Sequence, residues 1–301
     1  MKTLNILLVC FCFLLAFFPV LTLLKYACVG VYHIEENISD STQLIISTYG
    51  TLSSVKDGNR EIKIGTDFYD SHQRYAEGAT NSAGFREITG FVQINDTSTI
   101  IAVDSDNHCL RNISLLNNEF YSKTFAGKCT HNGSDDGLMI EEARFNRPYN
   151  IIEGYYQNEY YVTDFYNHAI RLIILKNSSV VTIRKHGDWK YPNAIALDCS
   201  NQILLVGVVF EPSGTLMKMD IDGQLIGFVK LKARPEEINT LIVFRSITDI
   251  ISVTSNIYLI TDWGNDKCYL LELAKNNTNA TIKEVINVLG PRSIALSASK
   301  R

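Results

Sequence analysis

The stretch TFAGKCTHNGSDDGLMIEEARFNRPYNIIEGYYQNEYYVTDFYNHAIRLIIL, from Thr124 to Leu175, decides the fold. Short apolar runs rich in β-branched and aromatic residues alternate in it with clusters of Gly, Asn, Asp and Pro, which is typical of antiparallel hairpins. With the run that follows, the predicted strands cover residues 150–152, 159–163, 169–175 and 179–183. Four such strands in one repeated unit match a blade of a β-propeller.

The same pattern occurs 60 residues earlier in the chain. Ala83-Gly-Phe85 matches Ala143-Arg-Phe145, and Asp104-x-x-Asn107-His108-x-x-Arg111 matches Asp164-x-x-Asn167-His168-x-x-Arg171. Self-similarity at a fixed offset marks a repeat architecture. Further upstream, we expect Tyr49-Gly50 and Asp57-Gly58 to correspond to Ala126-Gly127 and Asp136-Gly137, which makes residues 59–82 an insertion.

The unit from Thr124 to Leu175 resembles the NHL repeat. The family's Ala-Gly, Asp-Gly, Ala-x-Phe, Pro-x-x-Ile, Tyr-Val-x-Asp and Asn-His-x-Ile-Arg elements all occur in it in order. The resemblance weakens further along, where Leu205-Val-Gly207 lacks the aspartate and Asp266 and Tyr269 replace the histidine and arginine. Pro291-Arg-Ser-Ile294 begins another unit just before the last residue.

We therefore expect an all-β protein, a β-propeller of about five NHL-like blades, with six as the alternative, preceded by one N-terminal apolar helix. Four nearly complete blades are predicted over residues 86–127, 148–186, 192–231 and 246–290. An open ring would expose strand edges that pair with other chains. We expect strands from both chain ends, near residues 31–35, 43–49 and 293–297, to close the ring.

Antiparallel order places the turn between the second and third strands of a blade on the same face as the connection to the next blade. The candidate ligand-face residues at these turns are Asp104, Asn107, His108, Asp164, Asn167 and His168. Aspartate and asparagine also stabilise tight turns. Because every blade needs a turn and a catalytic residue is needed only once, the repetition favours a structural role for these residues.

Motifs and charge favour an interaction module over an enzyme. The net charge of −4 gives no basic face for nucleic-acid phosphates. The sequence has no His-Glu-x-x-His, Gly-x-Ser-x-Gly or phosphate-loop motif, so we predict no catalytic residue, metal ligand or cofactor. The predicted function is an extracellular or lumenal glycoprotein module that binds a protein, peptide or glycan on one propeller face.

The alternative function is a metal-dependent lyase or hydrolase. It rests on resemblance to the peptidyl-α-hydroxyglycine amidating lyase, whose propeller holds zinc through histidines. Catalytic zinc needs three converging protein ligands and an open position. The histidines available to this chain are His33, His72, His108, His131, His168 and His186.

The N-terminus contains one long apolar run, Leu4 to Leu24, which is long enough to cross a bilayer as a helix. It exceeds the usual core of a cleavable signal peptide and has no good small-x-small cleavage site. We expect residues 1–27 to form either a signal peptide or a signal-anchor transmembrane segment. Residues 28–301 then form the ectodomain, outside the cytosol.

Seven Asn-x-Ser/Thr sequons agree with a route through the secretory pathway. The predicted glycosylation sites are Asn37, Asn95, Asn112, Asn132, Asn177, Asn276 and Asn279.

Five cysteines lie outside the apolar run: Cys28, Cys109, Cys129, Cys199 and Cys268. Cys109 opens the third strand of its predicted blade and Cys129 follows the fourth, so both are expected on one face within disulfide reach. We predict a Cys109–Cys129 disulfide, favoured by an oxidising compartment. Cys199 and Cys268 are expected on opposite faces and therefore free.

Expression in secretory cells tests the predicted route of the chain. A cleaved protein will appear in the medium with a new N-terminus between residues 20 and 31, whereas an anchored protein will stay with membranes after a carbonate wash. Recovery of the chain in the cytosol would contradict both versions.

Overall fold

The structure is a computed structural model. It describes residues 6–9, 33–36, 43–47, 51–56, 59–65, 75–80, 82–94, 99–117, 119–185, 189–210, 213–232, 244–274, 278–287 and 293–296. Within these ranges the chain is almost entirely β-strand, and none of its helices is long and apolar enough to cross a membrane. Asn37, Asn95, Asn276, Cys28, His72 and His186 lie outside the described residues.

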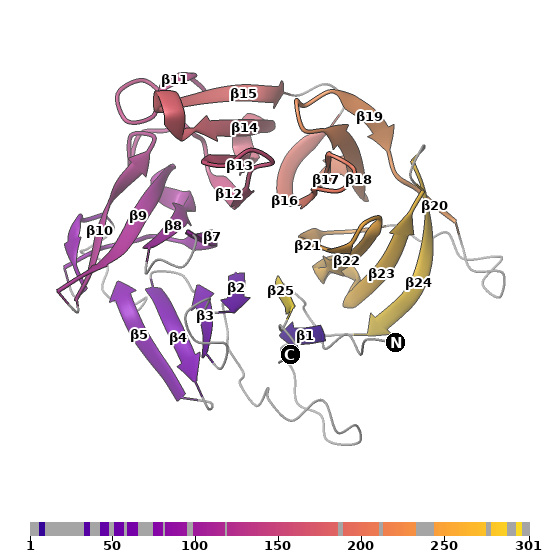
Figure 1. The fold of residues 1–301 in the computed structure, drawn as a ribbon, viewed down its shortest axis with the longest axis horizontal. Helices are drawn as coiled ribbons and strands as arrows, with labels where there is room; N and C mark the ends of the chain where they lie inside the picture. The colour runs from indigo at the N-terminus through magenta and orange to yellow at the C-terminus, as the bar shows by residue number, and fades with distance from the viewer. Residues whose placement is uncertain are drawn as a thin grey trace.

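The described residues form six β-sheets arranged radially around one axis (Figure 1), which confirms the predicted propeller with the alternative count of six blades instead of about five. We number them blade 1 to blade 6 along the chain. Their innermost strands are β2 (His33–Glu36), β7 (Ile88–Ile94), β12 (Pro148–Glu153), β16 (Lys190–Asp198), β21 (Ile247–Thr254) and β25 (Ser293–Leu296). Each lies against the next, and β25 lies against both β21 and β2, so the ring is closed.

The four predicted blades correspond to blades 2 to 5, but blades 2, 3 and 5 have a fifth, outermost strand instead of the expected four. Residues 230–232, whose start was assigned to the blade over 192–231, pair with the following blade instead. Blade 2 continues outward with β8 (Thr99–Asp104), β9 (Cys109–Leu116), β10 (Glu119–Ala126) and the outermost β6 (Gly78–Ala79). Blade 3 continues with β13 (Glu159–Asp164), β14 (Ala169–Ile174), β15 (Ser179–Lys185) and β11 (Gly137–Leu138). Blade 4 adds β17 (Ile203–Phe210), β18 (Ser213–Asp220) and β19 (Leu225–Phe228). Blade 5 adds β22 (Ile257–Asp262), β23 (Lys267–Leu273), β24 (Asn279–Asn287) and β20 (Lys230–Lys232), which pairs parallel to β24.

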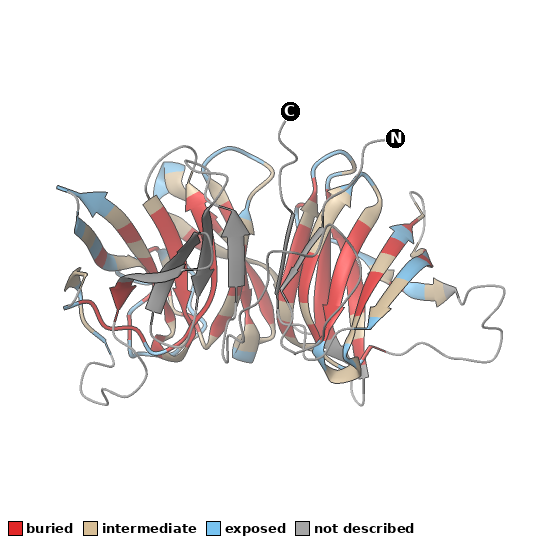
Figure 2. Ribbon diagram, turned by 90° about the horizontal axis from the view of Figure 1, so that it is seen from below, coloured by how far each residue is buried: buried red, intermediate tan, exposed pale blue. Residues whose placement is uncertain are grey.

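The hydrophobic core lies between successive blades. Tyr161 and Ile170 of blade 3 pack with Leu204 and Met217 of blade 4 in one of four buried apolar clusters. Buried residues run through the middle of the sheets, and exposed residues gather at their outer edges and turns (Figure 2). Because each sheet buries both faces against its neighbours, the stability of one blade depends on the next one.

Blade 1 corrects the sequence-based assignment. Residues 43–65 were expected to give isolated closing strands and an insertion, but they form β3 (Gln43–Ser47), β4 (Thr51–Lys56) and β5 (Asn59–Gly65), which with β2 make a whole blade. The element equivalent to Asp136-Gly137 is therefore Glu77-Gly78 and not Asp57-Gly58. Gly78 and Gly137 share a left-handed backbone, with φ of 133° and 129°.

Both chain ends close the ring, as expected, but with different strands. The partner of β25 in blade 6 is β1 (Ile6–Val9), which pairs antiparallel with it. These four residues lie in the apolar run and form a strand where we expected a helix, and they pair with the backbone of β25. Cleavage between residues 20 and 31 would remove this partner.

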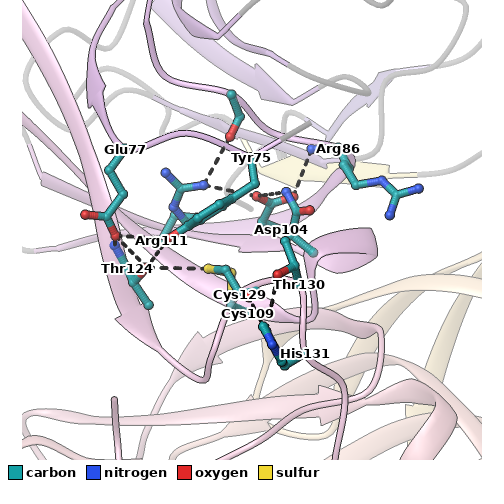
Figure 3. The surroundings of a disulfide bond; sticks show 12 residues. Tyr75, Glu77, Arg86, Asp104, Cys109, Arg111, Thr124, Cys129, Thr130 and His131 are labelled. Carbon is teal, nitrogen blue, oxygen red and sulfur yellow. Dashed lines mark hydrogen bonds and ion pairs between the residues drawn. A yellow bond between two sulfur atoms is a disulfide. The ribbon is translucent and has the colours of Figure 1, made fainter. Parts of the chain in front are cut away.

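The predicted disulfide is confirmed: Cys109 and Cys129 are bonded, with 5.0 Å between their Cα atoms (Figure 3). It ties the start of β9 to the loop after β10. Cys199 is exposed and Cys268 is buried, and among the described residues no disulfide joins them, as predicted.

Deletion of residues 293–301 is expected to open the ring, because β25 is the innermost strand between blades 5 and 1. We expect the midpoint of thermal unfolding to fall by at least about 5 °C, which corresponds to a loss of about 2 kcal/mol in a domain of this size. The exposed blade faces should also cause self-association in size-exclusion chromatography.

The matched control is deletion of residues 297–301, which leaves β25 intact. Equal unfolding midpoints for the two truncated proteins would contradict the closure by β25.

Candidate functional site

The candidate site lies on the propeller face that carries the turns between second and third strands, which we call the turn face. Three short 3-10 turns occupy it, η1 (Ser105–Asn107), η2 (Phe165–Asn167) and η5 (Trp263–Asn265). The structure places Asp104, Asn107 and His108 around η1, and Asp164, Asn167 and His168 around η2. The prediction that these residues share one face is therefore consistent with the strand order.

The two aspartates are fully buried hydrogen-bond acceptors. The Asp164 carboxylate accepts from the Asn146 N–H and the Asn167 Nδ2, both at 2.8 Å, and pairs with Arg171 Nη1 at 2.7 Å. Burial raises the pKa of Asp164 to about 6, while Arg171 and these donors oppose the rise, so the carboxyl is ionised at neutral pH. Its role is to hold the turn.

Blade 2 repeats this arrangement. Asp104 accepts from the Arg86 N–H at 3.0 Å and from Asn107 Nδ2 at 2.8 Å, and it pairs with Arg111 Nη1 at 3.3 Å. Burial raises the pKa of Asp104 too, against the opposing charge of Arg111. Blade 5 keeps the aspartate and the asparagine but not the histidine or the arginine of the repeat. Asp262 accepts a hydrogen bond from Asn265 Nδ2 at 2.7 Å.

The arginines fasten the connection between blades. Arg171 donates to the Arg144 and Asp135 carbonyls at 2.8 and 2.7 Å, and its guanidinium lies 5.1 Å from the ring centroid of Phe145. Arg111 has the corresponding contact with Phe85 at 4.8 Å. The phenylalanine of the Ala-x-Phe element and the arginine of the repeat therefore contact each other in both blades.

The histidines have a structural role as well. His108 and His168 end their turns in the left-handed conformation, with φ of 59° and 51°. Their Nδ1 atoms accept backbone N–H groups of the following blade connection, from Arg147 at 3.0 Å and from Tyr191 at 3.2 Å. Burial lowers the pKa of His108, which favours the neutral ring that this acceptor role needs.

The sequence did not predict a cluster of aromatic rings on the turn face, which we call the aromatic cluster; its members are Tyr149, Phe165, Tyr166, His168 and Tyr191. The Phe165 ring centroid lies 5.7, 5.2 and 5.1 Å from those of Tyr149, Tyr166 and Tyr191. Tyr166 is 44% exposed. The members come from β12, η2 and β16, so three segments separated in sequence converge here.

Arg147 anchors the edge of the aromatic cluster. Its guanidinium lies 5.5 Å from the Tyr166 ring centroid and pairs with Glu87 and Asp106, each at 2.7 Å. Burial disfavours its charge, but the hydrogen bonds to Glu87 and Tyr166 and the two carboxylates outweigh burial and raise the pKa of Arg147. Arg147 and Tyr191 both have positive φ, 50° and 51°, a strained backbone that concentrates at functional sites.

A signal for the aromatic cluster was present in the sequence. Two residues separate the buried aspartate from the asparagine in each turn, and these differ between blades: Ser105-Asp106, Phe165-Tyr166 and Trp263-Gly264. Trp263 is 48% exposed. In blades 3 and 5 this variable pair supplies the exposed aromatic side chain, Tyr166 or Trp263.

In the described ranges, no group of three or more His, Cys, Asp or Glu side chains is placed to hold a metal ion. His131, the remaining described histidine with a defined side chain, has its Nδ1 3.1 Å from the Cys129 carbonyl oxygen. His72 and His186 belong to the metal hypothesis but lie outside those ranges.

Asp164→Asn tests the buried pair. It keeps an acceptor for the turn but leaves the buried Arg171 without a counter-charge, which typically costs about 3–5 kcal/mol. Chemical denaturation should show a loss of this size in the free energy of unfolding. The control is Asp106→Asn, which removes a half-buried charge partner of Arg147 and should cost about 1 kcal/mol or less. Equal effects would contradict the structural role of Asp164.

No protein-family model matches the chain, and no curated protein matches it significantly. Solved β-propellers do match its fold. A chain of a nidogen/laminin complex has a TM-score of 0.60 at 11% identity, covering 90% of this chain and 86% of that one. U3-55K has a TM-score of 0.55 at 9% identity, covering 89% and 85%. The periplasmic gluconolactonase PpgL of Pseudomonas aeruginosa has a TM-score of 0.54 at 14% identity, covering 88% and 73%. At these identities the likeness extends to the fold alone.

Proposed function

We propose that this chain is an extracellular or lumenal glycoprotein module that binds a protein partner through the aromatic cluster on its turn face. The observation that carries the proposal is the exposed Tyr166 ring, packed on Phe165 and Arg147. Tyrosine, tryptophan and arginine are the residues that contribute most to binding energy at protein interfaces. The repeated Asp, Asn and His residues support this surface without contacting the partner.

The aromatic cluster is suited to binding because it is held in place before any partner arrives. Arg147 is fixed by two carboxylates, and the Tyr191 backbone is fixed by His168. Ordering flexible side chains costs about 0.5–1.5 kcal/mol each on association. Side chains already ordered in the free protein avoid most of this cost.

The proposed compartment has independent support. A disulfide persists in oxidising surroundings and is rare in the cytosol. The sequon residues Asn132 and Asn177 are exposed, as glycan attachment requires, whereas Asn112 and Asn279 lie half-buried in strands. We therefore expect Asn132 and Asn177 to be the occupied sites among the described residues.

The nidogen/laminin match offers a parallel for a protein partner, since a propeller of this shape occurs there in a protein complex. The fold likeness does not identify the partner of this chain. We propose a secreted or cell-surface protein, with peptide and glycan ligands as the narrower alternatives.

Tyr166→Ala is expected to weaken partner binding at least about tenfold, because truncating a central interface aromatic typically costs about 2 kcal/mol or more. The measurement is quantitative mass spectrometry of extracellular proteins retained by the immobilised chain, followed by titration of each enriched protein.

The matched control is Tyr156→Ala. Tyr156 is also an exposed tyrosine, at 59%, but it lies in the turn between β12 and β13, on the opposite face. A genuine partner is retained by the original chain and by this control and lost with Tyr166→Ala. Partners that survive Tyr166→Ala at full affinity would overturn the proposed site.

A further inference from the structure

A second feature of the turn face is a recess of about 590 Å³ at the outer side of blade 2. Residues 75–77, the end of β10 and the loop 127–131 form its walls, and Ile140 from the next connection completes it. Pockets for small ligands commonly have volumes of about 300–1,000 Å³. The aromatic cluster contributes no residue to this recess, so the two sites are separate.

The one carboxylate in the recess is already engaged. Glu77 Oε1 accepts from the Thr124 N–H at 2.8 Å and from the Thr124 hydroxyl at 2.6 Å, and the Tyr75 hydroxyl lies 3.3 Å away (Figure 3). The Thr124 hydrogen bonds hold the pKa of Glu77 below its usual range, against its partial burial. All three contacts are made by Oε1, and through them this carboxylate fastens the wall of the recess.

Two cations in the recess remain free to act on a ligand. Lys123 and Lys128 are exposed, and neither forms an ion pair with any described residue. Glu77 stays ionised, but the two lysines of the lining outnumber it, so the recess presents net positive charge although the whole chain carries −4. A ligand with an anionic group fits this charge.

The remaining lining combines apolar surface with a hydrogen-bonding side chain, which suits the binding of a sugar ring. Tyr75 is 37% exposed, with Arg111 5.0 Å from its ring centroid, and Ile140 is 53% exposed, so apolar surface faces the recess from two sides. The His131 Nδ1 lies 3.1 Å from the Cys129 carbonyl oxygen and 3.2 Å from the Thr130 hydroxyl. In the tautomer that donates from Nδ1 to the carbonyl, Nε2 is an acceptor for a ligand hydroxyl. Apolar ring contact together with hydroxyl recognition is the combination that a carbohydrate needs.

The disulfide makes the recess rigid. Cys129 lies in its wall and is bonded to Cys109 at the start of β9 (Figure 3). The Thr130 N–H donates to the Asn107 carbonyl at 2.7 Å. The loop 127–131 is thereby fixed to both β9 and η1. A fixed wall lowers the entropic cost of binding a small ligand.

We propose that this recess binds an anionic sugar residue, carboxylated or sulfated, with Lys123 and Lys128 as its counter-ions and Tyr75 as its stacking surface. The site is additional to the aromatic cluster and does not depend on the proposed protein partner.

The test uses the full chain, purified from secretory cells with Asn132→Gln so that no glycan of its own stands beside the recess. Binding of sialyllactose, sulfolactose and lactose is measured by calorimetry. These probes share a lactose scaffold and differ in charge, so the first two separate carboxylate from sulfate sources. We expect at least one anionic probe to bind at least about tenfold more tightly than lactose.

The double substitution Lys123→Gln and Lys128→Gln should abolish that preference, and Tyr75→Ala should weaken both anionic probes and lactose. Lys176→Gln is the charge control, because Lys176 is exposed in the turn between β14 and β15 on the opposite face. An unchanged preference in the double variant, equal binding of lactose, or tighter binding of a hexaglutamate peptide than of either sugar would overturn the proposal.

Discussion

The buried pair of Asp164 and Arg171 is the contact on which the rest of blade 3 depends. Both side chains are almost fully removed from water. An ionised carboxylate in that position is tolerable only if donors surround it. Asn146, Asn167 and Arg171 supply those donors, and Arg171 extends the network to the connection through Asp135 and Arg144. One ion pair thus fixes the second strand, the third strand and the link to the preceding blade.

The same network positions the surface above it. The turn that Asp164 holds ends at His168, whose ring accepts the Tyr191 N–H and stacks edge-on against the Tyr191 ring at 4.6 Å. Phe165 and Tyr166 project from that turn toward Tyr191. Because the aromatic rings sit on a turn whose base is buried and held by the Asp164 hydrogen bonds and ion pair, they form a rigid platform. Binding capacity at the surface is therefore a consequence of packing beneath it.

The sequence was sufficient to predict blades 2 to 5, the turn face and the Cys109–Cys129 disulfide, because these depend on local strand patterns and on a repeat with identical residues. The sequence-based prediction was wrong where different residue types fill the same structural role in different blades. Glu77 takes the place of Asp136, since either carboxylate can accept the N–H and hydroxyl of the facing threonine, Thr124 or Thr182. The sequence-based alignment therefore matched Asp57-Gly58 to Asp136-Gly137. Residues 59–65, which form β5 of blade 1, were then wrongly assigned to an insertion. The aromatic cluster and the recess were missed because each combines segments that only the ring brings together.

Each turn of the repeat in blades 2, 3 and 5 combines residues that are the same in all three and stabilise the turn with a residue that differs between these blades and determines the surface. Asp104, Asp164 and Asp262 accept the same donor, the asparagine three residues later, and all three are buried. The position directly after the aspartate is a buried serine in blade 2, a half-buried phenylalanine in blade 3 and an exposed tryptophan in blade 5. The hydrogen bond shared by the three turns joins the aspartate to the asparagine, so the residue directly after the aspartate differs between blades while that bond is kept. The exposed side chains of the turn face are thus set by a position that varies between blades, directly beside the buried aspartate that holds each turn.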